Sequence, residues 1–114
     1  MEIVRGTHIQ TKMNGASCSV DEYLTENVKI DFAIAHIRGR EPEVGEAENL
    51  ESIELVYVIE GEGSVTIDDR VTHIRRGDVI IISPGERFVW NGNLKLAIIC
   101  TPRWSVDKHV IHNE

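Results

Sequence analysis

Short apolar stretches separated by turn-forming residues make up most of the chain. In residues 27–38, Ile30, Phe32, Ile34 and His36 recur at every second position, which is typical of a strand, and Gly39 is expected to end it. From residue 54 onward such stretches follow one another closely. We expect strands at residues 54–59, 64–67, 71–74, 79–82, 87–90 and 94–100.

The residues between these stretches are typical of turns. Glycines at 61 and 63 and the sequence Ser83-Pro84-Gly85 are expected to be turns, and Asn91-Gly92 supplies the positive φ angles of a tight hairpin. Residues 39–49 are predicted to be a glutamate-rich loop, and residues 20–24 a short edge strand. No sustained 3.6-residue periodicity is present. Roughly eight short strands joined by turns predict an all-β sandwich or barrel with antiparallel pairing.

Composition narrows the class of protein. A chain of 114 residues is expected to form a single domain, and its net charge of −7 disfavours nucleic acid and anionic membrane surfaces. The first residues contain no apolar signal-peptide core, so a cytoplasmic protein is the expectation. The two cysteines, Cys18 and Cys100, form no metal-binding spacing, and Cys100 is expected to be a buried thiol.

Two short motifs carry a resemblance to a known family. Glu54, six residues and Gly61 match the end of the first cupin motif, G-x5-H-x-H-x3,4-E-x6-G. The stretch from Gly77 to Gly85 matches the second, G-x5-P-x-G-x2-H-x3-N, with Ser83 in the proline position. Over about residues 28–104 the chain therefore resembles the cupin superfamily, with residues 1–27 as N-terminal strands and loop and residues 105–114 as a tail.

The resemblance implies a double-stranded β-helix, which is a jelly-roll-like barrel, and commonly a homodimer. It also implies a divalent metal held by three histidines and a glutamate in the barrel. With a three-residue gap the first two histidine positions fall on Glu48 and Leu50, the glutamate is Glu54, and the third histidine position is Phe88. A four-residue gap places Ala47 and Asn49 there instead. All three histidines are therefore replaced, and we expect no metal at the usual position; a divalent metal held by Glu48, Glu54 and His36 stays open.

The remaining polar residues suggest acid–base chemistry. Glu48 and Glu54, if both point inward, would repel each other, so that one would hold its proton more tightly and the pair could act as acid and base. The alternative is that Glu48 lies in a solvated loop and Glu54 pairs with an arginine. His36 could line the cavity as a base or a ligand, or be packed in the sheet. His109 and His112 lie three residues apart in the tail and could bind a metal on a helix, although adventitious binding is the expectation at such a position.

Four apolar residues complete the candidate site: Leu50, Tyr57, Phe88 and Trp90. They either fill the core or line a pocket for a sugar or another small polar ring. We therefore expect a cupin barrel that binds a small organic ligand without a cofactor. The alternative is a cupin-type enzyme, either a metal-free isomerase or epimerase using glutamate and histidine, or a metal enzyme with non-standard ligands.

Overall fold

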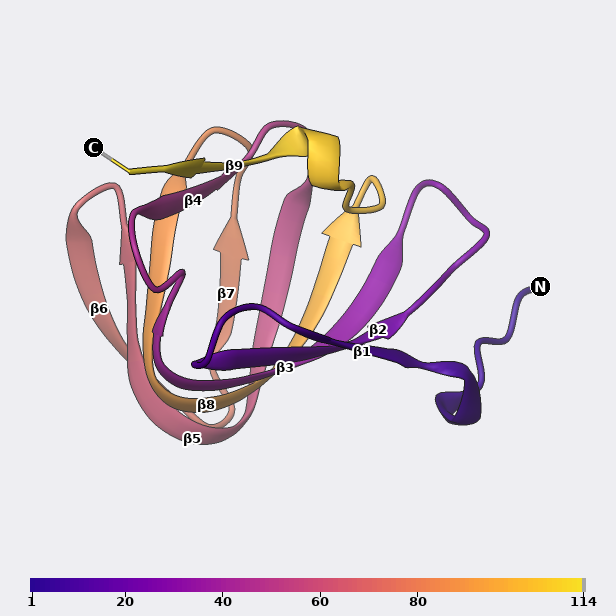
Figure 1. Ribbon diagram of the computed structural model, residues 1–114, viewed down its shortest axis with the longest axis horizontal. Coiled ribbons are helices and arrows are strands. Elements are labelled where there is room, and N and C mark those ends of the chain that lie inside the picture. Colours follow the sequence, from indigo (N-terminus) through magenta and orange to yellow (C-terminus); the bar gives the residue numbers. More distant parts are fainter. Residues whose placement is uncertain (114) are drawn as a thin grey trace.

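The protein is all-β. The structure is a computed structural model that describes residues 1–113, and within them every strand pairing is antiparallel (Figure 1). The strands are β1 (Gln10–Met13), β2 (Cys18–Tyr23), β3 (Asp31–Glu41), β4 (Glu46–Asn49), β5 (Ile53–Ile67), β6 (Arg70–Arg75), β7 (Val79–Ile82), β8 (Arg87–Thr101) and β9 (His109–His112). Two single turns of 3₁₀ helix, η1 (Gly6–His8) and η2 (Val106–Lys108), accompany them. In the described residues, no helix is long and apolar enough to cross a membrane.

The strands form one sheet that curls on itself. Its path is β1-β2-β3-β8-β4-β9, while β5 pairs with β6, β7 and β8. The two 15-residue strands, β5 and β8, are each bent into a U whose turn lies at the bottom of the view and whose two arms rise on either side (Figure 1). This arrangement confirms the predicted double-stranded β-helix of antiparallel strands.

Alternation along the strands creates the core. On β5 the residues Glu54, Val56 and Val58 are buried, while their neighbours Ile53 and Tyr57 are exposed. Leu96 of β8 lies opposite Val58 and is likewise fully buried. Apolar side chains pack one part of the barrel, and the interior beyond them is left open as a cavity.

Four of the glycines predicted to end strands, Gly39, Gly61, Gly63 and Gly92, instead lie inside strands. β3 continues past Gly39, β5 through Gly63 and β8 through Gly92, and these residues pair in one row, Gly39 with Gly92 and Gly92 with Gly63. The predicted Asn-Gly hairpin in β8 is therefore wrong. A Cβ atom on Gly92 would lie 2.6 Å from the Cα atom of Gly63, so the row lets long strands bend and approach closely where side chains would collide.

Two stretches expected to be irregular form strands. The predicted loop at residues 39–49 contains β4, which pairs with β8 and β9. The expected tail contains η2 and β9, and β9 closes over the barrel beside β4 (Figure 1). The last residue, Glu114, lies outside the described part of the chain. β9 is important for the site because it brings His109 to the cavity.

Candidate functional site

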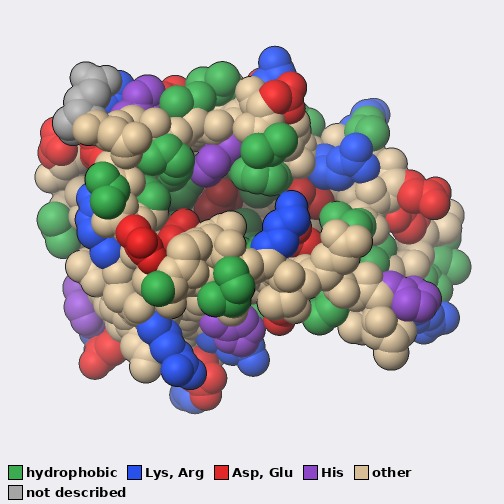
Figure 2. Space-filling model, viewed as in Figure 1, with side chains coloured by type: hydrophobic (Ala, Val, Ile, Leu, Met, Phe, Trp, Pro, Cys, Tyr) green, Lys and Arg blue, Asp and Glu red, His purple; other side chains and the backbone are tan. Residues whose placement is uncertain are grey.

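A cavity of about 640 Å³ opens into the barrel interior. It is lined by residues of β2, β3 and β8, by Ala47 and Glu54, and by the segment around Trp104 and His109. Figure 2 shows a hollow near the centre of this face, with acidic side chains and a histidine at its opening. A space of this size suits a small organic molecule.

Glu54 lies on the inner wall of the cavity and is 6% exposed. Its Oε1 accepts a hydrogen bond of 3.0 Å from Asn49 Nδ2 and a weaker contact of 3.9 Å from the Cys100 thiol. Burial raises the pKa of Glu54 to about 7, and the nearby charge of Asp31 acts in the same direction, against the two hydrogen bonds. No arginine or lysine pairs with Glu54 among residues 1–113. A carboxyl group without a cationic partner can hold a proton near neutral pH.

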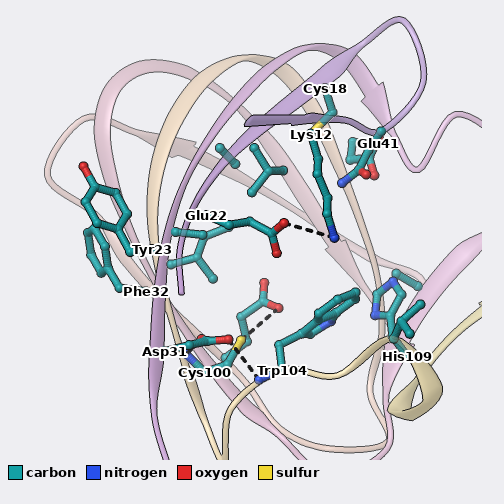
Figure 3. A pocket seen from close by; sticks show the side chains of 18 of the residues that line it. Lys12, Cys18, Glu22, Tyr23, Asp31, Phe32, Glu41, Cys100, Trp104 and His109 are labelled. Carbon is teal, nitrogen blue, oxygen red and sulfur yellow. Dashed lines mark hydrogen bonds and ion pairs between the residues drawn. The ribbon is translucent and has the colours of Figure 1, made fainter. Parts of the chain in front are cut away.

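Asp31 ties the cavity wall to the segment after β8. Its two carboxylate oxygens accept hydrogen bonds from the backbone N–H groups of Cys100, at 3.2 Å, and Trp104, at 3.0 Å. Figure 3 shows Asp31, Cys100 and Trp104 together at one side of the pocket. Burial is the main reason that the pKa of Asp31 is raised. The role that follows from these bonds is to place the Trp104 ring over the cavity.

The cavity carries more acidic than basic side chains. Lys12 reaches across from β1 to Glu22, with Nζ 3.1 Å from Oε1, and the two side chains point toward each other in Figure 3. The remaining charged lining residues are Asp31, Glu41, Glu54 and Arg103. This balance favours neutral or cationic molecules over anions.

Aromatic rings supply the flat surfaces. Phe88 and Trp90 lie on the same face of β8 with ring centroids 6.3 Å apart, and both are buried while lining the cavity. Trp104 lies 5.3 Å from the imidazole of His109, at 56° between the planes. Phe88 and Trp90 therefore both pack in the core and line the cavity.

The two cysteines are poor nucleophiles. Burial raises the pKa of Cys18 to about 12 and also raises that of Cys100, which the charge of Glu54 raises further. The burial predicted for Cys100 is confirmed, and its thiol remains protonated at neutral pH.

Several residues named from the sequence lie away from the cavity. Glu48 points outward from β4 and pairs with His112, with 2.7 Å between Oε1 and Nε2. His36 lies on the outer face of β3, 3.4 Å from Asp21. Leu50 and Tyr57 are 47% and 44% exposed and do not line the cavity. Of the residues named from the sequence, the structure brings together Glu54, Phe88 and Trp90.

The direction of the β4 side chains shows which motif spacing fits. Ala47 and Asn49 are buried and Glu46 and Glu48 are not, so the four-residue gap puts both histidine positions inside the barrel. Ala47, Asn49 and Phe88 then occupy the three histidine positions beside Glu54. Among residues 1–113 no three His, Cys, Asp or Glu side chains are grouped as a metal site. Alanine and phenylalanine cannot ligate, so this donor set does not fit the metal that the resemblance implies.

His109 is the site residue that the sequence did not reveal. On β9 it faces the opposite side from His112, because neighbouring positions of a strand alternate. Its Nδ1 lies 2.8 Å from Asn49 Oδ1, and the ring lines the cavity. Only the pairing of β9 with β4, a contact between residues about 60 apart in the chain, brings it there. The residue pattern of such a short stretch does not predict this pairing.

Solved structures similar to this one have related barrels. Streptomyces Pac13, in a structure with uridine, superposes with a TM-score of 0.87 at 14% identity, covering 97% of this chain and 90% of that chain. Another structure of Pac13, described as a unique nucleoside dehydratase, gives a TM-score of 0.86 at 14% identity over 100% of this chain and 94% of that one. An RmlC-like cupin from Shewanella frigidimarina gives 0.72 at 17% identity, covering 90% of this chain and 92% of that chain. At these identities the likeness shows the fold alone.

Sequence comparison places the chain in a family. A search of the curated proteins found no match. The model of the family described as "Cupin domain" matches residues 37–101, which include β4, the long strand β5 and all of β8. Because this match spans more than half of the chain, the protein belongs to the cupin domain family.

Proposed function

We propose that the protein binds a small, uncharged organic ring compound of the sugar or nucleoside class in the barrel cavity, without the three-histidine metal site. The observation that carries this proposal is the cavity itself, with about 640 Å³ of space between aromatic rings and the hydrogen-bonding Glu54. Aromatic rings contact the flat faces of such compounds, while a few polar groups fix their orientation. The uridine bound in the Pac13 structure makes a nucleoside the first probe to try.

The charge of the cavity supports an uncharged ligand. Four carboxyl groups line it (Glu22, Asp31, Glu41 and Glu54) against two basic side chains. A phosphate or carboxylate on the ligand would lie near this excess of acidic groups. Uridine 5′-monophosphate is therefore expected to bind at least about tenfold more weakly than uridine, since 1.4 kcal/mol of repulsion suffices for that factor.

Tryptophan fluorescence tests the proposal directly. The chain has two tryptophans, Trp90 and Trp104, and both line the cavity, so their emission reports its occupation. Titration with uridine and with methyl β-D-glucopyranoside is expected to give a saturable change for at least one of them. Ala33→Phe, which would place an aromatic ring inside the cavity, should strongly weaken the binding.

Ala97→Phe is the matched control. Ala97 lies on the outer face of the sheet, paired with Ile34 and Tyr57, so the same added ring would leave the cavity open. If Ala33→Phe binds the probe with unchanged affinity, the ligand lies elsewhere. No saturable change with either neutral probe would refute the proposal.

A further inference from the structure

A continuous set of hydrogen bonds joins His109 to Glu54 through Asn49. His109 Nδ1 lies 2.8 Å from Asn49 Oδ1, and Asn49 Nδ2 donates to Glu54 Oε1 at 3.0 Å. Asn49 is 2% exposed, so its amide is fixed between the two groups. Asn49 stands at one of the histidine positions of the cupin motif, and its amide links two titratable groups from different strands.

The contact with Asn49 determines the tautomer of His109. An amide oxygen can only accept, so His109 Nδ1 carries the hydrogen and Nε2 keeps its lone pair. No hydrogen-bond partner for Nε2 occurs among residues 1–113. Burial lowers the pKa of His109, which keeps the imidazole neutral. The Trp104 ring covers the imidazole on one side, as the close view of the pocket shows (Figure 3). His109 therefore has the features of a base.

The surroundings of Glu54, in contrast, favour the protonated form of its side chain. The groups that face it are Asn49 from β4, Asp31 from β3 and the Cys100 thiol from β8, and none of them is a cation. Burial together with the Asp31 charge favours the protonated carboxyl group. One cavity thus contains two titratable groups whose surroundings move their proton affinities in opposite directions, which is a pattern found at acid–base catalytic sites.

We propose that His109 and Glu54 form a proton-transfer pair acting on one molecule in the cavity, with Asn49 as the positioning residue. The inference rests on the proposed function, because the molecule must occupy the cavity. The substrate class is a neutral carbonyl compound. His109 Nε2 takes the proton from a carbon next to the carbonyl group, the C–H electron pair forms the carbon–carbon double bond, and Glu54 gives its proton to the carbonyl oxygen. The product of this step is an enol. Return of the proton from His109 to the opposite face of the same carbon, while the enol O–H proton goes back to Glu54, re-forms the carbonyl group and completes an epimerisation with no oxidant or reductant required.

The state of His109 can be tested without any ligand. Nitrogen-15 NMR of the imidazole distinguishes the two neutral tautomers and the charged ring, and His109→Gln assigns the signal among the five histidines. At pH 7 we expect a neutral ring with hydrogen on Nδ1, and in Asn49→Ala a mixture of tautomers. A charged ring, or hydrogen on Nε2 in the unsubstituted protein, would overturn the proposal.

A generic proton-abstraction probe tests the chemistry. In 5-nitrobenzisoxazole a base removes the ring C–H proton, the C–H electron pair forms the nitrile, and the N–O bond breaks with its electron pair on oxygen to give a coloured phenolate. His109→Gln is expected to lower the rate roughly 10²-fold, the lower end of general-base contributions. Glu54→Ala should also lower it, by a smaller factor, because the negative charge that develops on the oxygen then loses the hydrogen bond of the protonated carboxyl group. His8→Gln, a change at an exposed histidine, should leave the rate unchanged.

Tryptophan fluorescence in the same samples separates the two ideas. If neither this probe nor the neutral ring compounds change the emission, the cavity binds nothing and the proposed function fails together with the inference. If the probe binds but His109→Gln reacts as fast as the unsubstituted protein, the inference alone fails. Circular dichroism confirms that each variant is folded, and His109→Phe replaces His109→Gln if that variant is not.

Discussion

At the scale of single residues, the cavity depends on a carboxyl group that folding removes from water. The free Glu54 side chain would ionise at its ordinary pKa of 4.5, whereas burial raises that pKa to about 7. Ionised Glu54 gains hydrogen bonds from Asn49 and Cys100 but no cation. Because these hydrogen bonds do not offset the loss of hydration, the folded protein is expected to favour the protonated acid.

The stability of the protein should therefore fall as the pH rises. Between pH 4.5 and about 7 the folded state binds more protons at Glu54 than the unfolded state does, so the free energy of unfolding decreases and then levels off. The size of this loss is on the order of 3 kcal/mol, at 1.36 kcal/mol per pKa unit. The free energy of unfolding of Glu54→Gln, measured with urea at pH 4.5 and pH 8, should not show this decrease.

The comparison between variants isolates Glu54 from other groups. Burial moves the pKa of Asp31 in the same direction and that of His109 in the opposite direction, but both remain in Glu54→Gln and cancel in the difference. Glu62→Gln, at a side chain that is 72% exposed, serves as the control and should keep the full pH dependence. An equal pH dependence in Glu54→Gln and the unsubstituted protein would show that Glu54 is not the source.

At the scale of elements, the row of Gly39, Gly92 and Gly63 allows three neighbouring strands to bend together. Gly92 has a φ of +132° and would place a Cβ atom 2.6 Å from Gly63 Cα and 2.8 Å from the Glu62 carbonyl oxygen. Both atoms belong to the backbone of β5, so neither can move aside without breaking the pairing with β8. The bend is what turns a flat sheet into a barrel with an interior.

Gly92→Ala is expected to destabilise the protein by at least about 2 kcal/mol, from the strained φ together with the backbone collision. That corresponds to a fall in Tm of roughly 10 °C, which thermal unfolding followed by circular dichroism can measure. Gly6→Ala is the control, since nothing lies within 4 Å of the added Cβ atom there. A Tm for Gly92→Ala within a degree or two of the control would contradict this account of the bend.

The same row explains which elements the sequence could predict. Strand existence follows from local alternation, so β3, β6 and β7 and parts of β5 and β8 were evident, as was the fold class. A glycine, however, is interpreted as a turn whether the chain reverses direction or only bends. Both conformations favour a residue without a Cβ atom, so the sequence does not distinguish them. The cavity was predictable only where motif and alternation agree, at Glu54, Phe88 and Trp90. The contribution of His109 depends on a long-range pairing that local pattern does not encode.

At the scale of the whole molecule, one outer sheet face carries apolar side chains in rows. Leu55 lies between Ile81 and Ile99, and Tyr57 lies between Val79 and Ala97. Ile81, Val79 and Tyr57 are 59%, 55% and 44% exposed. Beyond these rows the sheet becomes charged, where Glu60 pairs with Lys95. An apolar face can pack against the same face of a second copy, as a two-fold symmetric interface requires, so it is where the homodimer expected from the cupin resemblance would form.

Ile81→Glu tests this arrangement. In a dimer formed through the face, the new carboxylate would be buried against apolar side chains without a partner, at a cost of several kcal/mol, so the variant should be monomeric while the unsubstituted protein is dimeric. Val71→Glu is the matched control: Val71 is 71% exposed but lies on β6, outside these rows, and its variant should remain a dimer. Light scattering coupled to size-exclusion chromatography measures the mass of each. If the unsubstituted protein is monomeric, the dimer is refuted, and if Ile81→Glu is still dimeric, the interface lies on another face.

Because the cavity residues come from one chain and face the opposite side of the sheet, the monomeric variant should still bind the neutral probe.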